Sequence, residues 1–257
     1  MDDQAMDPMS DYRARHVFYA EISNSIHIPM DCRVSLVSSP WRPRLGEIIT
    51  VQDEKGRHFR GRVLRISGPG CDVRLFEVLR KRMESPLDIL LLQSLPDKER
   101  MEWIIQKATE LGVSRIVPFF TERSITLEER EKRQRKAHRW PVVAQKAAKQ
   151  CRRAEIPVLE PYTDFQNALS YANGYELKII LWEKEREQGL NRVLSNGVRP
   201  DRICVLIGPE GGFAEKEIGM ARAKGFLSIG LGPRILRTET AAITIIAIIQ
   251  HIWGDLG

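Results

Sequence analysis

Long apolar runs are missing from this 257-residue sequence. No stretch reaches the roughly 18 apolar residues that a transmembrane helix requires. The four cysteines (Cys32, Cys71, Cys151 and Cys204) lie far apart and form no CxxC pair or Cys/His cluster, so we expect no metal site and no disulfide framework. The acidic first residues lack the apolar segment of a secretory signal, which makes a reducing cytoplasm the expected compartment.

Two nucleotide-binding fingerprints are also missing. The sequence contains neither GxGxxG nor GxxxxGK[ST], so a Rossmann dinucleotide site and a P-loop are not predicted. Internal repeats and low-complexity tracts do not occur either. At 42% apolar and 29% charged residues, the composition is that of a globular protein with one or two domains.

Positive charge is in excess, and it is unevenly distributed along the chain. Lys and Arg number 40 and Asp and Glu 34, giving a net charge of +6. Residues 1–11 hold four Asp and no basic residue, and resemble an extension or leader. Residues 12–83 carry a net charge of +7, and twelve of their fourteen basic residues are Arg. Because Arg suits bidentate contact with phosphate, this segment is either an RNA-binding surface or a solubilising one.

The segment 12–83 reads as short strands. Residues 47–52 and 57–66 flank a turn that ends in Gly56, which predicts a β-hairpin. Another strand is expected at 73–78, and little of the segment has helical spacing. We therefore predict a small β-barrel of about 70 residues.

From residue 84 the pattern changes to that of an α/β domain, so we divide the chain into domains 12–83 and 84–257. The near-continuous apolar run 87–92 is typical of a strand buried on both faces. Further strands are predicted at 115–120, 177–182, 203–207 and 227–231, and helices at 98–111, 128–153 with a kink at Pro141, 214–224 and 240–253. Alternating strands and helices predict a mostly parallel sheet.

Two glycine-rich loops are the strongest candidates for a binding site. The first, at 208–212, follows the strand 203–207, and the second begins at Gly232 after the strand 227–231. Ligands of parallel sheets bind at the carboxyl ends of strands, and glycines allow close approach of the backbone. If the two strands are neighbours, both loops line one cleft. An ordinary strand-to-helix turn is the competing interpretation.

The second loop also carries charged residues. Arg234 and Arg237 are placed to reach a phosphate or a developing anion, or they are surface charges. Thr238 or Thr240 can cap the final helix, and Glu239 lies where the helix dipole favours an anion. Lys146, Lys149 and Arg153, with Arg152 beside them, would form a basic stripe on the helix 128–153 that either contacts phosphates or is merely solvated.

The final helix is apolar on nearly every side. Its isoleucines include Ile245, Ile248, Ile249 and Ile252. Such a helix must be buried on more than one side. The interpretations are burial in the core and burial in a subunit interface, and we predict a homodimer that uses these four residues.

At the two loops the sequence resembles a known family. Residues 206–213 (LIGPEGGF) and 231–242 (LGPRILRTETAA) resemble the RsmE-type 16S ribosomal RNA (uracil-N3)-methyltransferases of the SPOUT class. Residues 98–112, 118–124 and 150–153 also match, and the resemblance covers about residues 85–257. The first domain matches less well, because His27 is followed by Ile-Pro-Met in place of a Val-Leu-Arg-type segment.

The resemblance implies a fold, a cofactor and partners. It implies an N-terminal PUA-like barrel, a C-terminal domain with a trefoil knot, a homodimer with its active site at the subunit interface, no metal, and a substrate of 16S ribosomal RNA or the small ribosomal subunit. The cofactor is S-adenosylmethionine, and the residues implied to contact it are Trp182, Ile207, Gly208, Pro209, Glu210, Gly211, Gly212, Leu231, Gly232, Ile235, Leu236, Thr240 and Ala241.

The implied reaction methylates N3 of one uridine. Arg234 or Arg237 would stabilise the uracil anion, and Glu239 would organise the site, with a role as general base as the alternative. Two other functions remain open: a non-catalytic RNA-binding protein of ribosome assembly, and a nucleotide- or phosphate-binding enzyme that uses the loops as anion nests.

Overall fold

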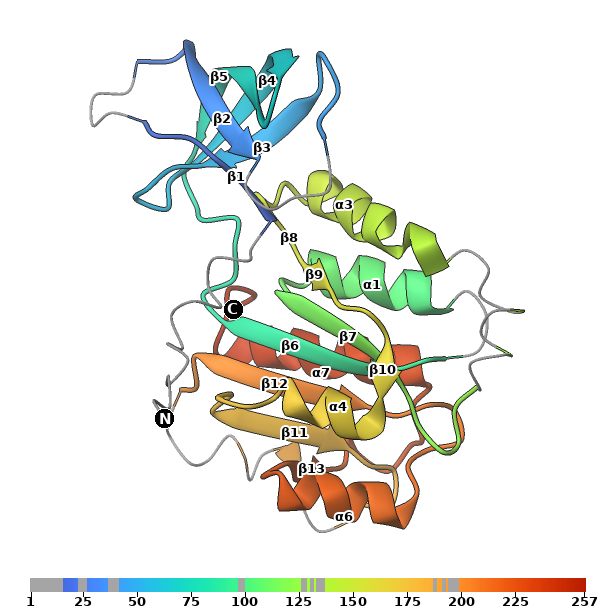
Figure 1. The fold of residues 1–257 in the computed structure, drawn as a ribbon. Helices are drawn as coiled ribbons and strands as arrows, with labels where there is room; N and C mark the ends of the chain where they lie inside the picture. The colour runs from blue at the N-terminus through green and yellow to red at the C-terminus, as the bar shows by residue number, and fades with distance from the viewer. Residues whose placement is uncertain are drawn as a thin grey trace, which may run out of the picture. The chain divides into compact units, whose positions relative to one another are not determined.

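The computed structural model describes residues 16–22, 27–36, 42–96, 100–125, 129, 132, 137–186, 189–190, 193 and 199–257 (Figure 1). Two compact units divide the chain: the first contains residues 1–84 and 148–158, and the second contains 85–147 and 159–257. The first unit is built on a mainly antiparallel sheet and the second on a parallel sheet covered by helices. The segment 1–11 lies outside the described residues.

The first unit consists of six short strands. They are β1 His16–Tyr19, β2 Met30–Leu36, β3 Ile48–Gln52, β4 His58–Ser67, β5 Gly70–Leu79 and β8 Glu155–Ile156, in the order β2-β5-β4-β3-β1-β8. The predicted hairpin is confirmed as β3 and β4, with Ile48 opposite Arg62 and Gln52 opposite His58. β1 pairs with β3 and also with β2. Side chains that alternate along β4 and β5, such as Phe59, Val63 and Val73, form the buried core of the unit.

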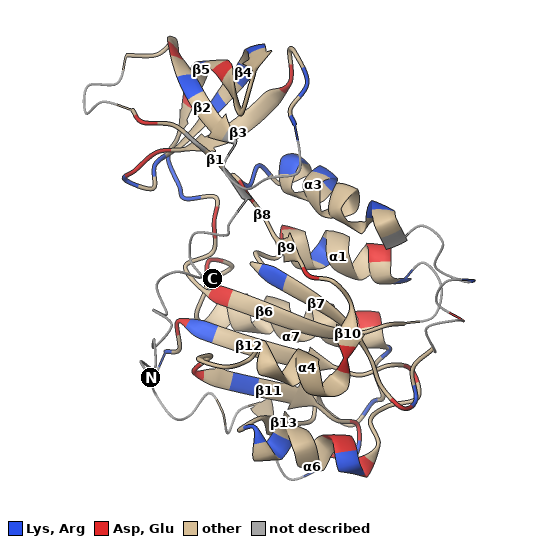
Figure 2. Cartoon of the chain, in the orientation of Figure 1, with Lys and Arg blue, Asp and Glu red and all other residues tan. Residues whose placement is uncertain are grey.

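The second unit is built around a parallel sheet. Its strands are β6 Asp88–Ser94, β7 Arg115–Phe120, β9 Val158–Leu159, β10 Thr163–Asp164, β11 Leu177–Leu181, β12 Arg202–Ile207 and β13 Leu227–Ile229, in the order β10-β7-β6-β12-β11-β13 with β9 beside β7. Asp88, Arg115 and Arg202 begin β6, β7 and β12, so charge stands at the amino ends while the interiors of the strands are apolar (Figure 2). The predicted buried strands are thereby confirmed.

Helices cover both faces of this sheet. The named helical segments of the chain are α1 Arg100–Glu110, a 3-10 turn η2 Ala137–Arg139, α3 Trp140–Gln150, α4 Phe165–Ser170, α6 Glu215–Ala223 and α7 Thr238–Ile252. On one face, Leu90, Leu92 and Leu206 share an apolar cluster with residues of α4 and α6. On the other face, α7 packs against β12 and α1 (Figure 1). Apolar residues at both odd and even positions of β6 and β12 are buried because both faces are covered.

The prediction of a basic stripe on a helix from 128 to 153 is wrong at the carboxyl end of that helix. Of its described residues, α3 covers only Trp140–Gln150, and Pro141 lies in the first turn, where a missing N–H disturbs no hydrogen bond and causes no kink. Lys146 and Lys149 are exposed, and Lys149 forms an ion pair with Glu47. Arg152, also exposed, has a φ of 66°, so the helical spacing does not continue to the next residue.

Arg153 is buried rather than part of a basic surface. Its Nε lies 2.8 Å from Oε2 of Glu84, and the other oxygen of Glu84 accepts the backbone N–H groups of Ala154 and Glu155 at 2.7 and 3.0 Å. A buried charge needs such a partner to offset the loss of hydration. Glu84 therefore holds the segment 148–158 in the first unit.

The final helix is buried less evenly than the sequence predicts. Ile245 and Ile249 are fully buried inside their own chain, so they cannot contribute to a dimer interface, which corrects that part of the prediction. Ile248 is half-buried and Ile252 is exposed. Among the described helices, α7 included, none is long and apolar enough to cross a membrane.

Gln250 joins α7 to the end of α1 and generates a stability prediction. Its buried side chain donates from Nε2 to the carbonyl of Leu111 at 2.7 Å and accepts the hydroxyl of Ser85 at 3.0 Å. Gln250→Leu should lower the free energy of unfolding by about 1–3 kcal/mol, because a buried carbonyl loses its partner. Chemical denaturation measures this loss. Ser85→Ala, which removes a hydroxyl that also accepts the backbone N–H of Leu87 at 3.0 Å, should cost a similar amount. Equal stability of Gln250→Leu and the unchanged protein would contradict the prediction.

Candidate functional site

Three parallel strands end side by side in the second unit. β12 lies between β6 and β11, and β11 pairs with β13 on its other side. The register places Ile180 beside Leu206 and Leu181 beside Ile229. The sequence suggests that the two glycine-rich loops follow neighbouring strands. In the structure they do not, because β11 lies between β12 and β13. Consequently the segment after β11 joins them as a third loop.

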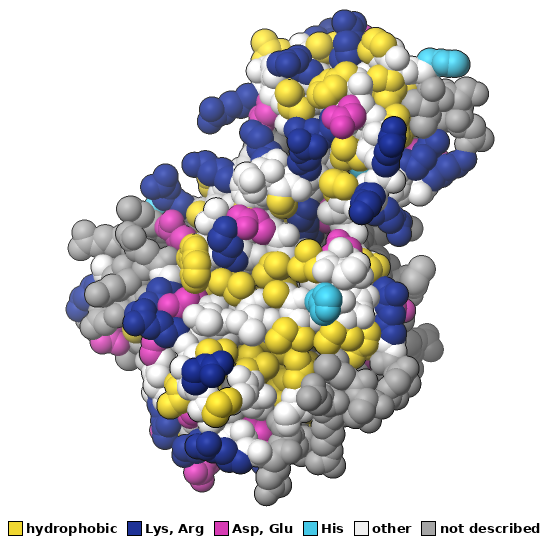
Figure 3. All heavy atoms as spheres, turned by 180° about the vertical axis from the view of Figure 1, so that it is seen from behind, with side chains coloured by type: hydrophobic (Ala, Val, Ile, Leu, Met, Phe, Trp, Pro, Cys, Tyr) yellow, Lys and Arg dark blue, Asp and Glu magenta, His cyan; other side chains and the backbone are white. Residues whose placement is uncertain are grey.

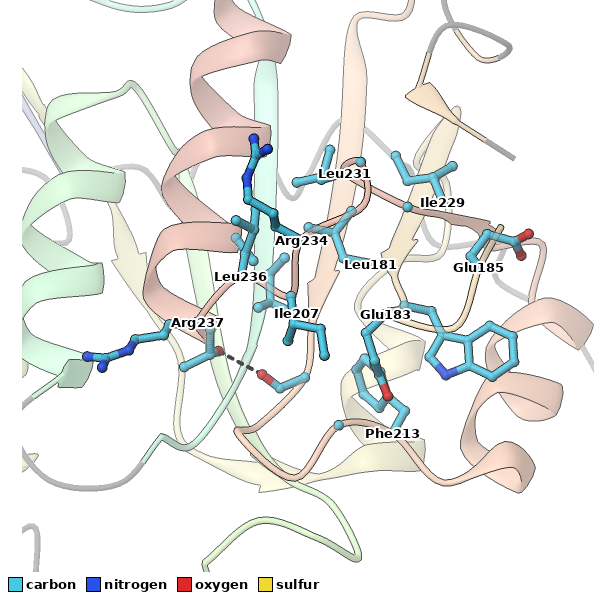
Figure 4. Close-up of a pocket in the computed structure, with 18 of the residues that line it drawn as sticks. Leu181, Glu183, Glu185, Ile207, Phe213, Ile229, Leu231, Arg234, Leu236 and Arg237 are labelled. Atoms are coloured by element: carbon cyan, nitrogen blue, oxygen red, sulfur yellow. Dashed lines mark hydrogen bonds between the residues drawn. The ribbon is translucent and has the colours of Figure 1, made fainter. Parts of the chain in front are cut away.

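These loops enclose a cavity of about 460 Å³ at the carboxyl edge of the sheet. Its lining consists of residues 181–183, 185–186, 207–213, 229–238 and 241. Figure 4 shows side chains from all three loops arranged around it. Apolar groups such as Ile207, Leu231 and Ile235 share the lining with three Glu and three Arg. Ile235 is 84% exposed despite its apolar side chain, so a ligand in the cavity could cover it.

Two glycines are required by the backbone of these loops. Gly212 has a φ of +67° and Gly232 a φ of +89°, a region that other residues adopt only with strain. A side chain at Gly212 would also begin 2.7 Å from Oε1 of Glu183. The glycines at these positions therefore set the path of both loops.

The hydroxyl of Thr238 joins the loop after β12 to the start of α7. It donates to the carbonyl of Gly208 at 2.7 Å and accepts Nε2 of Gln93, at the end of β6, at 3.0 Å. Gln93 is fully buried and Thr238 is 5% exposed. The expected capping role of Thr238 or Thr240 is not found, because the N-cap of α7 is Arg237 and makes no side-chain hydrogen bond.

Two arginines outside the cavity lining contact the loop after β12. Arg100 of α1 donates to Oε1 of Glu210 at 2.5 Å, and its Nε lies 3.8 Å from Oε1 of Glu239. Arg123, after β7, donates to the carbonyl of Gly211 at 3.4 Å. Through Arg100 the loop that carries Glu210 is connected to the first turn of α7.

The structure brings most of the predicted site residues together. Every residue that the resemblance implies for the cofactor lines the cavity except Thr240, which is exposed and outside it. Arg234 and Arg237 also line the cavity, but their guanidinium groups point in different directions (Figure 4). Glu239 is 8% exposed and lies outside the lining, beside Arg100.

The comparison with known proteins identifies the family. A model of an RNA methyltransferase domain matches residues 83–250. A ribosomal RNA small subunit methyltransferase E from Buchnera aphidicola is 31% identical over 233 residues, which cover 90% of this chain and 90% of that relative. The chain belongs to this family of RNA methyltransferases.

Solved structures of similar proteins carry a ligand. A methyltransferase from Legionella pneumophila, in complex with the cofactor SAM, is 33% identical with a TM-score of 0.66, over 93% of this chain and 99% of that one. The ribosomal RNA small subunit methyltransferase E from Neisseria gonorrhoeae, bound to S-adenosyl methionine, is 28% identical with a TM-score of 0.67, over 94% of this chain and 100% of that one.

The sequence interpretation missed part of this methyltransferase site. Glu183, Glu185 and Arg186 line the cavity, yet only Trp182 was implied from their segment. They follow a correctly predicted strand, so their place after a carboxyl end was a usable signal. What the sequence could not supply was the order of the strands, which puts this loop between the other two.

The Thr238 contact generates a prediction for this member of the methyltransferase family. Thr238→Val keeps the shape of the side chain but leaves the carbonyl of Gly208 and the amide of Gln93 without that partner, so unfolding should become easier by about 1–3 kcal/mol. Amide hydrogen exchange in residues 208–212 should accelerate. Thr240→Val, two residues along the same helix but exposed, is the control and should change stability by less than about 0.5 kcal/mol. The same exchange rate in both variants would count against the role of Thr238.

Proposed function

We propose that this chain transfers a methyl group from S-adenosylmethionine to N3 of a uridine in 16S ribosomal RNA. The observation that carries the proposal is the three-loop cavity, whose lining includes nearly all residues that the family resemblance assigns to the cofactor. Similar solved structures with this cofactor bound support the assignment. Ribosomal subunits mature in the cytoplasm, so we assign the reaction to that compartment.

The cavity fits this cofactor by size and chemistry. Its volume of about 460 Å³ lies within the roughly 300–1,000 Å³ of small-molecule sites. Ile207, Leu231 and Ile235 offer apolar contact to an adenine ring, and at Gly232 no atom lies within 4 Å of the place a side chain would take, so the backbone there is open to a ligand. We assign cofactor binding to the lining residues named above, without Thr240. When bound, the cofactor supplies an activated methyl group on a sulfonium.

The reaction requires removal of one proton from the uracil and stabilisation of the anion that develops on its ring. Uracil N3–H is a weak acid, so its proton has to leave as the N3–methyl bond forms. Arg234 or Arg237 would donate to the oxygens of the developing uracil anion, and such fixed donors can lower a barrier by several kcal/mol. Glu239, held near Arg100, would organise the first turn of α7. A role for Glu239 as the base that takes the N3 proton is the alternative.

We assign RNA capture to the domain 12–83 and catalysis to the domain 84–257. Pairing of β1 with both β2 and β3 supports a PUA-like barrel in the first domain. In the second, we propose that the loop 230–237 and α7 form the family's trefoil knot. Lys146, Lys149 and Arg152 remain candidates for phosphate contact because they are exposed, whereas the burial of Arg153 removes it from that set.

Methyl transfer from labelled S-adenosylmethionine tests the function directly. The purified protein should label 16S ribosomal RNA, free or in small subunits, and mass spectrometry should locate the methyl group on N3 of one uridine. Ile235→Ala should raise KM for S-adenosylmethionine about ten- to a hundredfold, because roughly 1.5–3 kcal/mol of apolar burial is lost on binding. Its thermal stability should not change, because Ile235 is exposed.

Leu256→Ala is the matched control, since Leu256 is also an exposed apolar residue but lies outside the cavity lining. Its KM should equal that of the unchanged protein. RNA binding without uptake of S-adenosylmethionine would favour the non-catalytic RNA-binding alternative and refute the proposal.

We further propose a homodimer that uses the uncovered face of α7. Ile248 and Ile252 leave apolar surface on this helix. Seen from behind, where α7 lies in front of the sheet, the second unit presents a broad gathering of hydrophobic side chains (Figure 3). Large exposed apolar patches on a protein mark interaction sites. The family resemblance, which implies an active site at the subunit interface, names a second copy of the chain as the partner.

Ile248→Asp should therefore produce a monomer in sedimentation velocity and abolish methyl transfer, because a charge in an apolar interface is costly. Met220→Asp introduces the same charge at an exposed apolar position of α6 and should leave the dimer and the activity intact. An unchanged protein that is monomeric at micromolar concentration and fully active would contradict both the dimer and the shared site.

A further inference from the structure

Three carboxylates line the cavity, and two of them already have cationic partners. Oε2 of Glu185 accepts Arg222 at 3.1 Å and the hydroxyl of Ser228 at 2.5 Å. Oε1 of Glu210 accepts Arg100 at 2.5 Å. Arg222 and Arg100 are not themselves lining residues. The negative charges of Glu185 and Glu210 are therefore balanced from outside the cavity.

Glu183 differs from the other two. Within the part of the chain that the structure describes, its carboxylate has no ion-pair or hydrogen-bond partner. It is the second residue after β11, and its Oε1 lies 2.7 Å from the point where a side chain at Gly212 would begin. The absent side chain at Gly212 thus allows this carboxylate to lie against the backbone of the loop after β12. Figure 4 shows its side chain among those that line the cavity.

The remaining charges of the lining are positive. Arg186, Arg234 and Arg237 line the same cavity, and no described carboxylate forms an ion pair with any of them. Three arginines would repel a cationic ligand. Glu185 and Glu210 would attract it only weakly, because each is already paired with an arginine. The field of Glu183 is the compensation that the cavity itself supplies.

We infer that Glu183 is the counter-charge of the sulfonium of S-adenosylmethionine and the residue by which the cavity distinguishes this cofactor from its product. The inference rests on the proposed function. When the methyl group leaves for N3, the S–CH3 bond breaks with its electron pair remaining on sulfur, and the sulfonium becomes a neutral thioether. The attraction to Glu183 disappears in the same step, which favours exchange of product for fresh cofactor.

Calorimetric titration of Glu183→Gln with three ligands tests the inference. S-adenosylmethionine carries the sulfonium, S-adenosylhomocysteine keeps everything but the methyl group and its charge, and 5′-methylthioadenosine keeps only the nucleoside thioether. The Kd for S-adenosylmethionine should rise about three- to tenfold at low salt, a range that allows for solvent screening of an exposed carboxylate. The other two constants should stay within about twofold of those of the unchanged protein.

Glu215→Gln is the matched control. Glu215 is 80% exposed and pairs with Lys184 outside the lining, so its removal changes the net charge equally but should leave all three constants unchanged. Thermal stability of Glu183→Gln should match that of the unchanged protein, because no hydrogen bond is lost.

An equal loss of affinity for all three ligands would mean that Glu183 contacts the ribose or supports the packing of the loop. That result would overturn the inference. Unchanged affinity for S-adenosylmethionine would overturn it as well. Failure of the unchanged protein to bind any of the three ligands would instead refute the proposed function.

Discussion

The hydroxyl of Thr238 is the contact on which the arrangement of the site depends. It is the only atom group described here that bonds both Gly208, in the loop after β12, and Gln93, at the end of β6. Because it begins α7, the same residue fixes where the final helix starts relative to the sheet. The loop that ends at Thr238 lines the cavity together with the loops after β11 and β12.

The charges around this contact follow a consistent pattern. Carboxylates that hold the structure together are paired: Glu210 with Arg100, Glu185 with Arg222, and Glu217 with the backbone N–H groups of Ala214 and Glu122. Arg234 and Arg237, by contrast, are exposed in the lining. These carboxylates have partners within the chain, whereas no described carboxylate forms an ion pair with Arg234 or Arg237. The side chains of Glu185 and Glu217 are buried, and leaving a buried charge unpaired is costly.

Local patterns of the sequence predicted the main strands of the parallel sheet, because burial on both faces leaves a continuous apolar run in the sequence. They missed the helix α4 and the short strands β8, β9 and β10, which have too few residues to show a period. The order of the strands is a property of the whole sheet, so the position of β11 between β12 and β13 could not be read from any one segment. Helical spacing also misled at Arg153, since the chain leaves the helix before that residue through the positive φ of Arg152. The loop from Gly208 to Gly212 was predicted from its glycines at the end of a strand and again from the family resemblance, while Glu183 lies in no comparable motif.

The contacts of Glu84 limit how this protein can be divided into fragments. Since it holds residues 153–155, the first unit is completed by a strand that the chain reaches only after building much of the second. A fragment ending at residue 84 would lack β8 and would leave that carboxylate without its three donors. The two units therefore cannot be exchanged as consecutive gene segments, and a chimaera that keeps the first unit intact must transplant two separate stretches of the gene together.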